Sequence, residues 1–241
     1  YENNDGQYNR LIELVLNDDG WHEERVLLDK IPSGNVHHGG RIKIGPDGKL
    51  YVTTGDAATP ALAQDLTSLA GKILRLNLDG SIPDDNPIKG TYIFSYGHRN
   101  PQGLAWDGNR KLYSSEHGAS AHDEINLIVP GANYGWPVIQ GNEKKGNMEL
   151  PLFHSSSTTW APSGIAFHND MLYVAQLRGQ GIRAFDLENK THKQVVSGFG
   201  RVRDIFIIDN ALYFITNNTD GRGQPGPKDD RLLKLTLTED F

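Results

Sequence analysis

The chain has 241 residues, no cysteine and a formal net charge of −6 at pH 7. The lack of cysteine excludes disulfides and thiolate metal sites, and the acidic balance argues against a nucleic-acid partner, whose phosphates bind basic surfaces. No apolar run approaches the roughly 20 residues that a membrane-spanning helix needs, so no membrane span is expected.

One pattern recurs four times along the chain: a short apolar run, a polar turn, then Leu-Tyr and a second apolar run. A pattern of two apolar runs around a polar turn predicts a β-hairpin. The four hairpins are expected at 40–56, 103–118, 164–179 and 202–221.

Further strands are expected after each hairpin. Third strands with alternating apolar positions begin at Gly71, Asp123, Gln180 and Asp230, and a fifth copy begins at Asn9. Three fourth strands are expected, beginning at Arg25, Thr91 and Lys193. Repeated four-stranded units of about 40 to 60 residues, without helical periodicity between them, are typical of a β-propeller. A β-sandwich is the weaker alternative, because sandwiches lack this ordered repetition.

The two ends of the chain indicate that its strands are part of a larger propeller. The first recognisable element, at Asn9, is expected to be the third strand of a blade. Four hairpins and this partial unit amount to about four and a half blades of four antiparallel strands. An open ring would expose unpaired strand edges. We therefore expect residues 1–241 to form a single propeller domain from which the N-terminal blade or so is absent.

Five arginines stand where hairpins and blades begin. Equivalent inner-strand positions of successive blades converge on the axis of a propeller, and guanidinium groups bind carboxylates or phosphates bidentately. The arginines therefore predict a site for an anion with several such groups, unless they are unrelated surface or blade-locking residues. They are Arg41, Arg99, Arg178, Arg201 and Arg203.

Two adjacent histidines precede the first hairpin. Neighbouring residues of a strand face opposite ways, so at most one of His37 and His38 points towards the axis. Asp56 ends the same hairpin, and its carboxylate can orient such a histidine as a general base. The alternative is a structural histidine bound to backbone, and spacing alone does not choose between the two positions.

Two loops carry further candidates. Pro101 pushes Asn100 away from helical geometry, which predicts a loop at a strand end for Arg99 and Asn100, either a binding loop or an ordinary turn. Around 116–124, carboxylates separated by small residues offer the hard oxygen ligands that calcium prefers, unless they are merely solvated. The aromatic residues Tyr134, Trp136 and Trp160 are candidates to stack on a sugar or to pack between blades.

Four ordered segments resemble the soluble quinoprotein sugar dehydrogenases, which are six-bladed propellers that use pyrroloquinoline quinone (PQQ) and calcium. The segments are HHGGRIKIGPDGKLYVTTGD, SYGHRNPQGLAWD, EHGASAHDEINLIVPGANYGWP and GRVRD. The short connections are similar to those of the aldose sugar dehydrogenase branch, and the likeness runs from about Asn35 to the C-terminus. It implies oxidation of an aldose at C1 to the lactone, with hydride transfer to the quinone and an external electron acceptor. It also implies an extracellular or periplasmic location.

The resemblance also assigns roles to single residues. The pattern His-x-x-Gly-Arg falls on His37, which it makes the catalytic base, with Asp56 as its support. The residues that it places on the cofactor are Arg99, Asn100, Arg178, Arg201 and Arg203, and Arg178 stands where glucose dehydrogenases carry a lysine. The resemblance gives the catalytic calcium to the backbone carbonyls of Gly118 and Ala119. It gives a structural calcium to Glu124 with the carbonyl of Tyr134.

Two other functions remain open at this stage. A calcium-dependent propeller lactonase needs inward carboxylates and an asparagine around a central metal, and a non-catalytic propeller binds a sugar or a partner protein without the quinone. His37 and the set of arginines speak against both alternatives.

Overall fold

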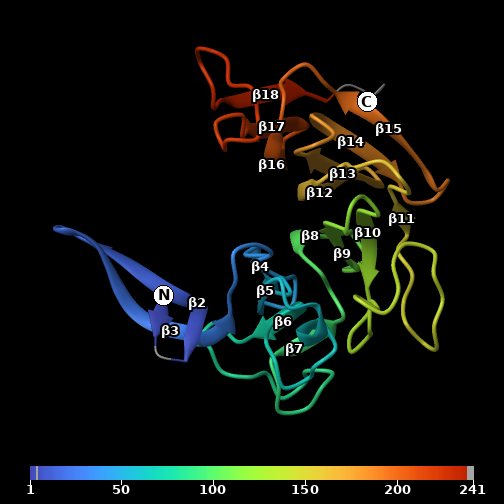
Figure 1. The fold of residues 1–241 in the computed structure, drawn as a ribbon. Coiled ribbons are helices and arrows are strands. Elements are labelled where there is room, and N and C mark those ends of the chain that lie inside the picture. Colours follow the sequence, from blue (N-terminus) through green and yellow to red (C-terminus); the bar gives the residue numbers. More distant parts are fainter. Residues whose placement is uncertain (4, 238–241) are drawn as a thin grey trace. The chain divides into compact units, whose positions relative to one another are not determined.

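The computed structural model describes residues 1–3 and 5–237 and folds them almost entirely into antiparallel β-sheets (Figure 1). The only helix in this described part is the 3-10 helix η1, Pro60–Ala63. Three sheets have four strands and two have three, all joined in sequence order by antiparallel pairs. The prediction of an all-β chain with four-stranded antiparallel sheets is confirmed.

Internal contacts divide the chain into two compact units. Unit 1 comprises residues 1–101, 129–139 and 144–149. Unit 2 comprises residues 102–128, 140–143 and 150–241. The single domain expected for residues 1–241 stays a prediction.

Unit 1 contains two sheets. The first is formed by β1 (Glu2–Asn3), β2 (Gly6–Asn17) and β3 (Gly20–Pro32), and the second by β4 (Ile42–Ile44), β5 (Leu50–Thr54), β6 (Lys72–Leu76) and β7 (Ile93–Tyr96). Every residue of β5 and β6 is buried, because neighbouring chain covers both faces of these central strands. An apolar cluster that includes Leu11, Leu28, Val52 and Leu74 packs the two sheets together.

The β2–β3 hairpin is buried only near its base. Leu11 and Leu28 are 7% and 5% exposed, whereas Leu16 and Trp21 near the turn are 61% and 67% exposed. The hairpin extends away from the second sheet of its own unit (Figure 1).

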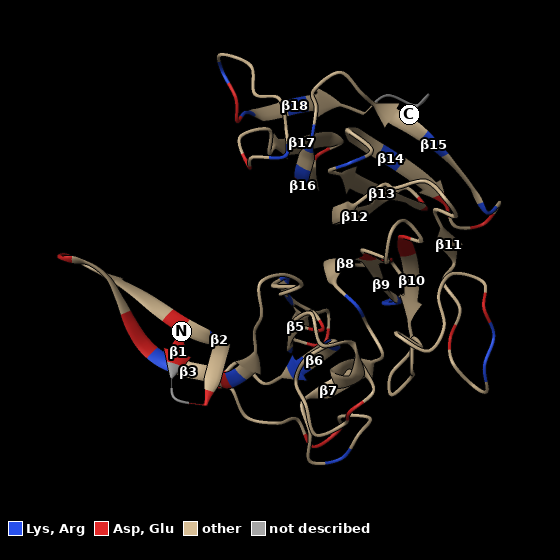
Figure 2. Cartoon of the chain, viewed as in Figure 1, with Lys and Arg blue, Asp and Glu red and all other residues tan. Residues whose placement is uncertain are grey.

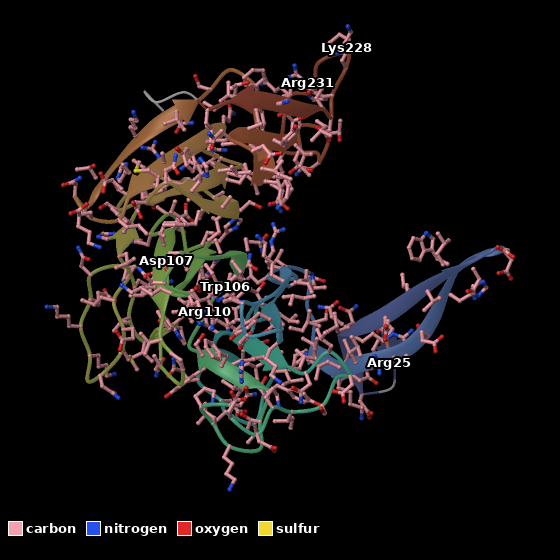
Figure 3. All side chains as sticks on the ribbon, turned by 180° about the vertical axis from the view of Figure 1, so that it is seen from behind. Arg25, Trp106, Asp107, Arg110, Lys228 and Arg231 are labelled. Atoms are coloured by element: carbon pink, nitrogen blue, oxygen red, sulfur yellow. The ribbon has the colours of Figure 1, made fainter. Side chains whose placement is uncertain are left out.

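An aspartate organises each of the first two predicted turns. In the β4–β5 turn, Asp47 accepts the backbone N–H of Lys49 at 3.1 Å and the hydroxyl of Tyr51 at 3.0 Å. In the next turn, Asp107 (labelled in Figure 3) accepts the backbone N–H of Lys111 at 2.8 Å and the hydroxyl of Tyr113 at 3.2 Å. The tyrosine of the recurring Leu-Tyr pair therefore ties its strand to the preceding turn in these two copies.

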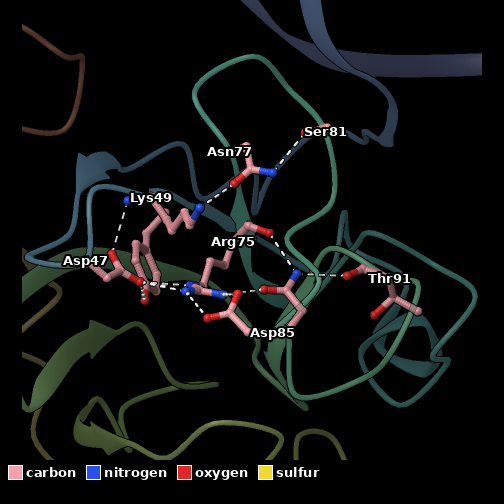
Figure 4. A network of polar contacts seen from close by, with 9 residues as sticks. Asp47, Lys49, Arg75, Asn77, Ser81, Asp85 and Thr91 are labelled. Atoms are coloured by element: carbon pink, nitrogen blue, oxygen red, sulfur yellow. Dashed lines mark hydrogen bonds and ion pairs between the residues drawn. The ribbon is translucent and has the colours of Figure 1, made fainter.

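Arg75 on β6 links this turn to a second loop (Figure 4). Its Nε donates to Asp47 at 2.9 Å, and Nη1 and Nη2 donate to the two oxygens of Asp85 at 2.8 and 3.0 Å. Nη1 also donates to Asn86 at 2.9 Å. The side chain of Arg75 is 6% exposed, so a buried cation with two carboxylate partners fixes the loop that leads from β6 to β7.

Unit 2 contains the other three sheets. The first is formed by β8 (Pro101–Trp106), β9 (Leu112–Glu116), β10 (Glu124–Ile128) and β11 (Phe153–His154). The second is formed by β12 (Pro162–His168), β13 (Met171–Gln176), β14 (Gly181–Asp186) and β15 (Thr191–Val196). The third is formed by β16 (Val202–Ile208), β17 (Ala211–Thr216) and β18 (Leu232–Thr236).

The first strands of these sheets lie very close to one another, which explains two glycines of the repeat. A Cβ at Gly103 on β8 would lie 2.4 Å from the carbonyl oxygen of Ser163 on β12. A Cβ at Gly164 on β12 would lie 1.7 Å from the Asp204 carboxylate on β16. Two apolar clusters fill the space farther along these sheets, one around Phe185 and Trp160 and the other around Leu212 and Phe214.

Two strands lie outside the sequence prediction. The short β1 precedes the first expected strand, and β11 supplies the fourth strand of its sheet although none was expected there. β11 pairs with β10 only through His154 with Glu124 and Phe153 with Ile125.

Acidic and basic residues are scattered along the loops and strands of both units (Figure 2). No helix in residues 1–3 and 5–237 has the length and apolarity needed to cross a membrane.

Candidate active site

The His37 side chain is hydrogen-bonded to Asp56 in unit 1. Nδ1 of His37 lies 2.8 Å from Oδ1 of Asp56, and the two side chains are 20% and 1% exposed. An ionised carboxylate can only accept, so Nδ1 carries a proton, and in the neutral imidazole Nε2 is then the basic nitrogen. The pair therefore presents a basic nitrogen from an oriented imidazole.

The backbone around this pair is tightly packed. His37 has φ 63°, a left-handed conformation that is uncommon outside glycine. A Cβ at Gly55 would lie 2.0 Å from the carbonyl oxygen of His37, and a Cβ at Gly39 would lie 2.6 Å from that of Thr53. The N–H of Ala57 donates to the carbonyl of His37 at 3.2 Å. These glycines let the segment before β4 lie directly on the end of β5.

Asp56 receives three hydrogen bonds. Besides His37, its carboxylate accepts the indole Nε1–H of Trp136 at 2.8 Å on Oδ2 and the backbone N–H of Ala58 at 2.9 Å on Oδ1. Burial alone would raise the pKa of the Asp56 carboxyl, but the bonds from His37, Trp136 and Ala58 bring it below its ordinary value. Asp56 is therefore a buried anion at neutral pH.

Arg99 and Asn100 lie beside this pair, at the end of the loop between β7 and β8 and directly before Pro101. The amide oxygen of Asn100 accepts the N–H of Gly39 at 3.1 Å, and the carbonyl of Arg99 accepts the N–H of Asp56 at 2.8 Å. The guanidinium of Arg99 lies over the ring of Trp136, 5.4 Å from its centroid. The structure thus brings together four predicted site residues of unit 1: His37, Asp56, Arg99 and Asn100.

The other three predicted cofactor arginines belong to unit 2. Arg201 is 7% exposed, and its Nε and Nη2 donate to Oδ2 of Asp220 at 3.1 and 2.7 Å. Arg203, half-buried on β16, has Nη1 3.5 Å from the hydroxyl of Ser163. Arg178 is exposed in the loop after β13. Asp220 is a partner of Arg201 that the sequence analysis did not identify.

The predicted calcium loop is held by Asp123. Its Oδ1 accepts the N–H of Gly118 at 3.0 Å, and its Oδ2 accepts the N–H groups of Trp160 and Ala161 at 2.7 and 2.8 Å. A Cβ at Gly118 would lie 2.2 to 2.3 Å from the carbonyl oxygens of Ala121 and His122. No side chain therefore fits at position 118, and the catalytic calcium site at the carbonyls of Gly118 and Ala119 stays a prediction. Ala119 lies half-buried in this loop.

Glu124 lies opposite Glu116 across the β9–β10 pair. Burial raises the pKa of Glu124 to about 8, and the charge of Glu116 adds to the effect. Tyr134, its predicted partner, lies in unit 1 and is 5% exposed. No group of three or more His, Cys, Asp or Glu side chains is placed to hold a metal ion in residues 1–3 and 5–237. The structural calcium site stays a prediction.

Two of the three candidate sugar-stacking aromatics are core residues. Tyr134 and Trp160 are 5% and 6% exposed, and Trp160 packs edge-on against Phe185. Trp136 differs, because its ring lies between Asp56 and Arg99. No local pattern in the sequence indicates its bond to Asp56, which joins positions 80 residues apart.

Comparison with known proteins gives a consistent picture. The family model of glucose/sorbosone dehydrogenases matches residues 1–233, so the likeness extends to the first residue of the chain. The chain is 47% identical over 137 residues to quinoprotein glucose dehydrogenase B of Acinetobacter calcoaceticus, a match that covers 48% of this chain and 29% of that protein. It is 33% identical over 226 residues to aldose sugar dehydrogenase YliI of Escherichia coli, covering 80% of this chain and 60% of that protein.

A solved structure agrees with these matches. The PQQ-bound aldose sugar dehydrogenase of Streptomyces coelicolor superposes with a TM-score of 0.89 at 37% identity, covering 93% of this chain and 71% of that one. This similarity confirms the predicted fold class of antiparallel propeller blades. The chain spans less than two thirds of the length of the two curated relatives.

Proposed function

Because the chain belongs to the glucose/sorbosone dehydrogenase family, we propose that it oxidises aldose sugars at C1 to the lactone with PQQ and calcium. The observation that carries this proposal is the His37–Asp56 pair, which stands at the family's His-x-x-Gly-Arg pattern with a contact of 2.8 Å. Oxidation of a sugar hydroxyl requires a base that removes its proton, and an oriented imidazole is such a base.

Several observations support the fit of the two cofactors. PQQ carries carboxylates, and guanidinium groups such as those of Arg201 and Arg203 are their preferred partners. The ion pair with Asp220 uses Nε and Nη2 of Arg201 and takes no bond from Nη1. The backbone carbonyls of Gly118 and Ala119, to which the family resemblance gives the catalytic calcium, are hard oxygen ligands of the kind that calcium prefers. Bound PQQ would supply the hydride acceptor, and bound calcium would supply the Lewis acid that polarises it.

The residues of unit 1 would carry the proton transfer. Nε2 of His37 would accept the proton of the anomeric hydroxyl when the C1 hydride is given up to the bound quinone. The Asp56 anion stabilises the imidazolium that forms, and its contact with Nδ1 keeps Nε2 as the basic nitrogen. Arg99 and Asn100, fixed to the same segment through Asp56 and Gly39, are proposed to contact the quinone.

The remaining parts of the proposal follow from the family resemblance. Bound PQQ would pass its electrons to an external acceptor, and the reaction would take place in the periplasm or outside the cell. The short connections predict an open sugar site, which accepts several aldoses because few polar groups are left unpaired by a different sugar.

Reconstitution of this chain tests the proposal. Apoprotein is mixed with calcium and PQQ, and dye reduction is followed with glucose and other aldoses. PQQ binding is measured separately as a rise in melting temperature. Aldose-dependent dye reduction that requires both additions supports the proposal. Lactone hydrolysis with calcium alone would support a lactonase instead, and a chain that binds neither PQQ nor a sugar contradicts the proposal.

A further inference from the structure

The segment 133–136 is anchored to unit 1 by polar contacts near η1. Gln64 and Asn133 exchange two side-chain hydrogen bonds of 3.0 and 2.8 Å, and Nε2 of Gln64 also donates to the carbonyl of Trp136 at 2.7 Å. The N–H of Trp136 donates to the carbonyl of Gly97 at 2.9 Å. Gly97 has φ +76°, and a Cβ there would lie 2.2 Å from the amide oxygen of Asn133. The backbone of Trp136 is therefore fixed at both its N–H and its carbonyl.

The indole of Trp136 links two groups of opposite charge. Its Nε1–H donates to Oδ2 of Asp56 at 2.8 Å, and its ring face lies 5.4 Å from the Arg99 guanidinium. Asp56 is 1% exposed, so water has little access to replace a lost donor. The other carboxylate oxygen, Oδ1, receives His37 and Ala58. Trp136 is thus the side chain that holds the carboxylate from the side opposite His37.

We propose that Trp136 is a positioning residue for the base: its indole N–H fixes the Asp56 carboxylate so that Oδ1 accepts Nδ1–H of His37 and leaves Nε2 as the basic nitrogen. The proposal rests on the proposed function and adds to it the residue that sets the histidine tautomer. Gln64 supports Trp136 by fixing its backbone carbonyl.

The physical reason is the geometry of a carboxylate with three donors. A carboxylate bound on both oxygens has a defined rotation about its Cβ–Cγ bond, and Oδ1 then points along the Nδ1–H direction. Without the indole donor, Oδ2 is a buried acceptor with no partner, which is unfavourable. The carboxylate rotates to recover a donor, and the bond that selects the Nδ1–H tautomer of His37 weakens.

Trp136→Phe tests this step because phenylalanine keeps an aromatic face for Arg99 and lacks the N–H donor. Trp21→Phe is the matched control, since Trp21 is 67% exposed near the turn of the β2–β3 hairpin. The first readout is the ¹⁵N spectrum of histidine-labelled apoprotein, which distinguishes the two tautomers and requires no activity. The His37 signals are assigned by their loss in His37→Ala. We expect mainly the Nδ1–H tautomer in wild type and Trp21→Phe, and both tautomers in Trp136→Phe.

The second readout is steady-state kinetics of the reconstituted chain. Trp136→Phe should lower kcat by roughly tenfold, because a charge-assisted hydrogen bond is lost, while KM changes by less than about twofold. If Trp136→Phe folds poorly, Gln64→Ala is the second variant, because it removes the hydrogen bond to the Trp136 carbonyl. It should shift the tautomers of His37 in the same direction.

The two measurements together decide whether Trp136 positions His37. A lower kcat with an unchanged His37 tautomer overturns the positioning role, as does a variant unchanged in both measurements. A tautomer shift accompanied by a lower kcat supports it. If the wild-type chain shows no PQQ-dependent turnover but the tautomer still shifts in Trp136→Phe, the positioning of His37 stands and the proposed dehydrogenase function is wrong.

Discussion

Arg201 and Asp220 form an ion pair in which two guanidinium nitrogens, Nε and Nη2, donate to one carboxylate oxygen at 3.1 and 2.7 Å. Asn217 donates to the same oxygen at 2.8 Å, and the N–H of Arg222 donates to the other oxygen at 2.9 Å. Asp220 therefore both neutralises a buried cation and orients its remaining nitrogen, Nη1. This arrangement suits an arginine that must hold a second anion.

Asp220→Ala should lower the free energy of unfolding by roughly 2 kcal/mol, because it leaves the 7%-exposed Arg201 without its counter-charge. Arg201→Ala should lower the free energy of unfolding by less. The double variant should be more stable than Asp220→Ala alone. Urea denaturation of the two single variants and the double variant measures this coupling. Both single variants should also bind PQQ more weakly. Additive stability effects would contradict the ion-pair interpretation.

The two adjacent histidines offer a matched pair of variants. His37→Ala should reduce turnover to background, because it removes the proposed base, while PQQ still raises the melting temperature. His38→Ala should keep near-normal kcat, since His38 is exposed and its Nδ1 contacts only Asn9 and Ser33, at 3.2 and 3.3 Å. Dye-reduction kinetics of the two variants check both expectations. Near-normal kcat in His37→Ala would refute its catalytic role.

The sequence predicted the strands that have a local signal. The Leu-Tyr hairpins repeat a polar turn between apolar runs, and Asp47 and Asp107 show why tyrosine recurs in the first two. β11 could not be predicted in the same way. Its two residues carry no periodicity, and they reach β10 only after the long connection through 129–152.

The candidate site also contains some contacts that the sequence indicates and others that it does not. The bond between His37 and Asp56 joins the two ends of one hairpin, so spacing within a strand pair indicated it. The bond from Trp136 to Asp56 joins positions 80 residues apart and forms only through tertiary folding. No residue near Trp136 in the sequence indicates this bond. Asp220 lies in a polar loop, where a carboxylate is ordinarily solvated. The sequence therefore could not predict its ion pair with Arg201 either.

Arg75→Met should lower the free energy of unfolding by about 3 kcal/mol, because it removes the shared cation of Asp47 and Asp85 from a buried position. Methionine retains much of the aliphatic length, so the loss reports mainly on the charged contacts. Arg110→Met is the control: Arg110 is an exposed residue of the β8–β9 turn (Figure 3). Urea denaturation measures both variants, and equal stability of the two would show that the network in Figure 4 contributes nothing.

Lys72 has a buried ammonium group that makes stability depend on pH. Nζ donates to the carbonyls of Leu62, Ala63 and Ala70 at 2.8, 3.1 and 2.6 Å. Burial lowers the pKa of Lys72 from 10.5 to about 8, opposed weakly by the charge of Asp65. Between these two values the unfolded chain holds a proton that the folded chain has released, so this group favours the folded state increasingly as pH rises.

The Lys72→Met variant isolates this contribution, because methionine does not titrate. We expect the difference in unfolding free energy, wild type minus variant, to be constant below pH 7 and to rise by about 3 kcal/mol between pH 8 and 10.5. Lys89→Met, in the exposed loop before β7, should show no such rise. Urea titrations at half-unit pH intervals measure both differences. A flat difference for Lys72→Met would mean that the ammonium keeps its proton throughout, and that three backbone carbonyls compensate for the lost hydration.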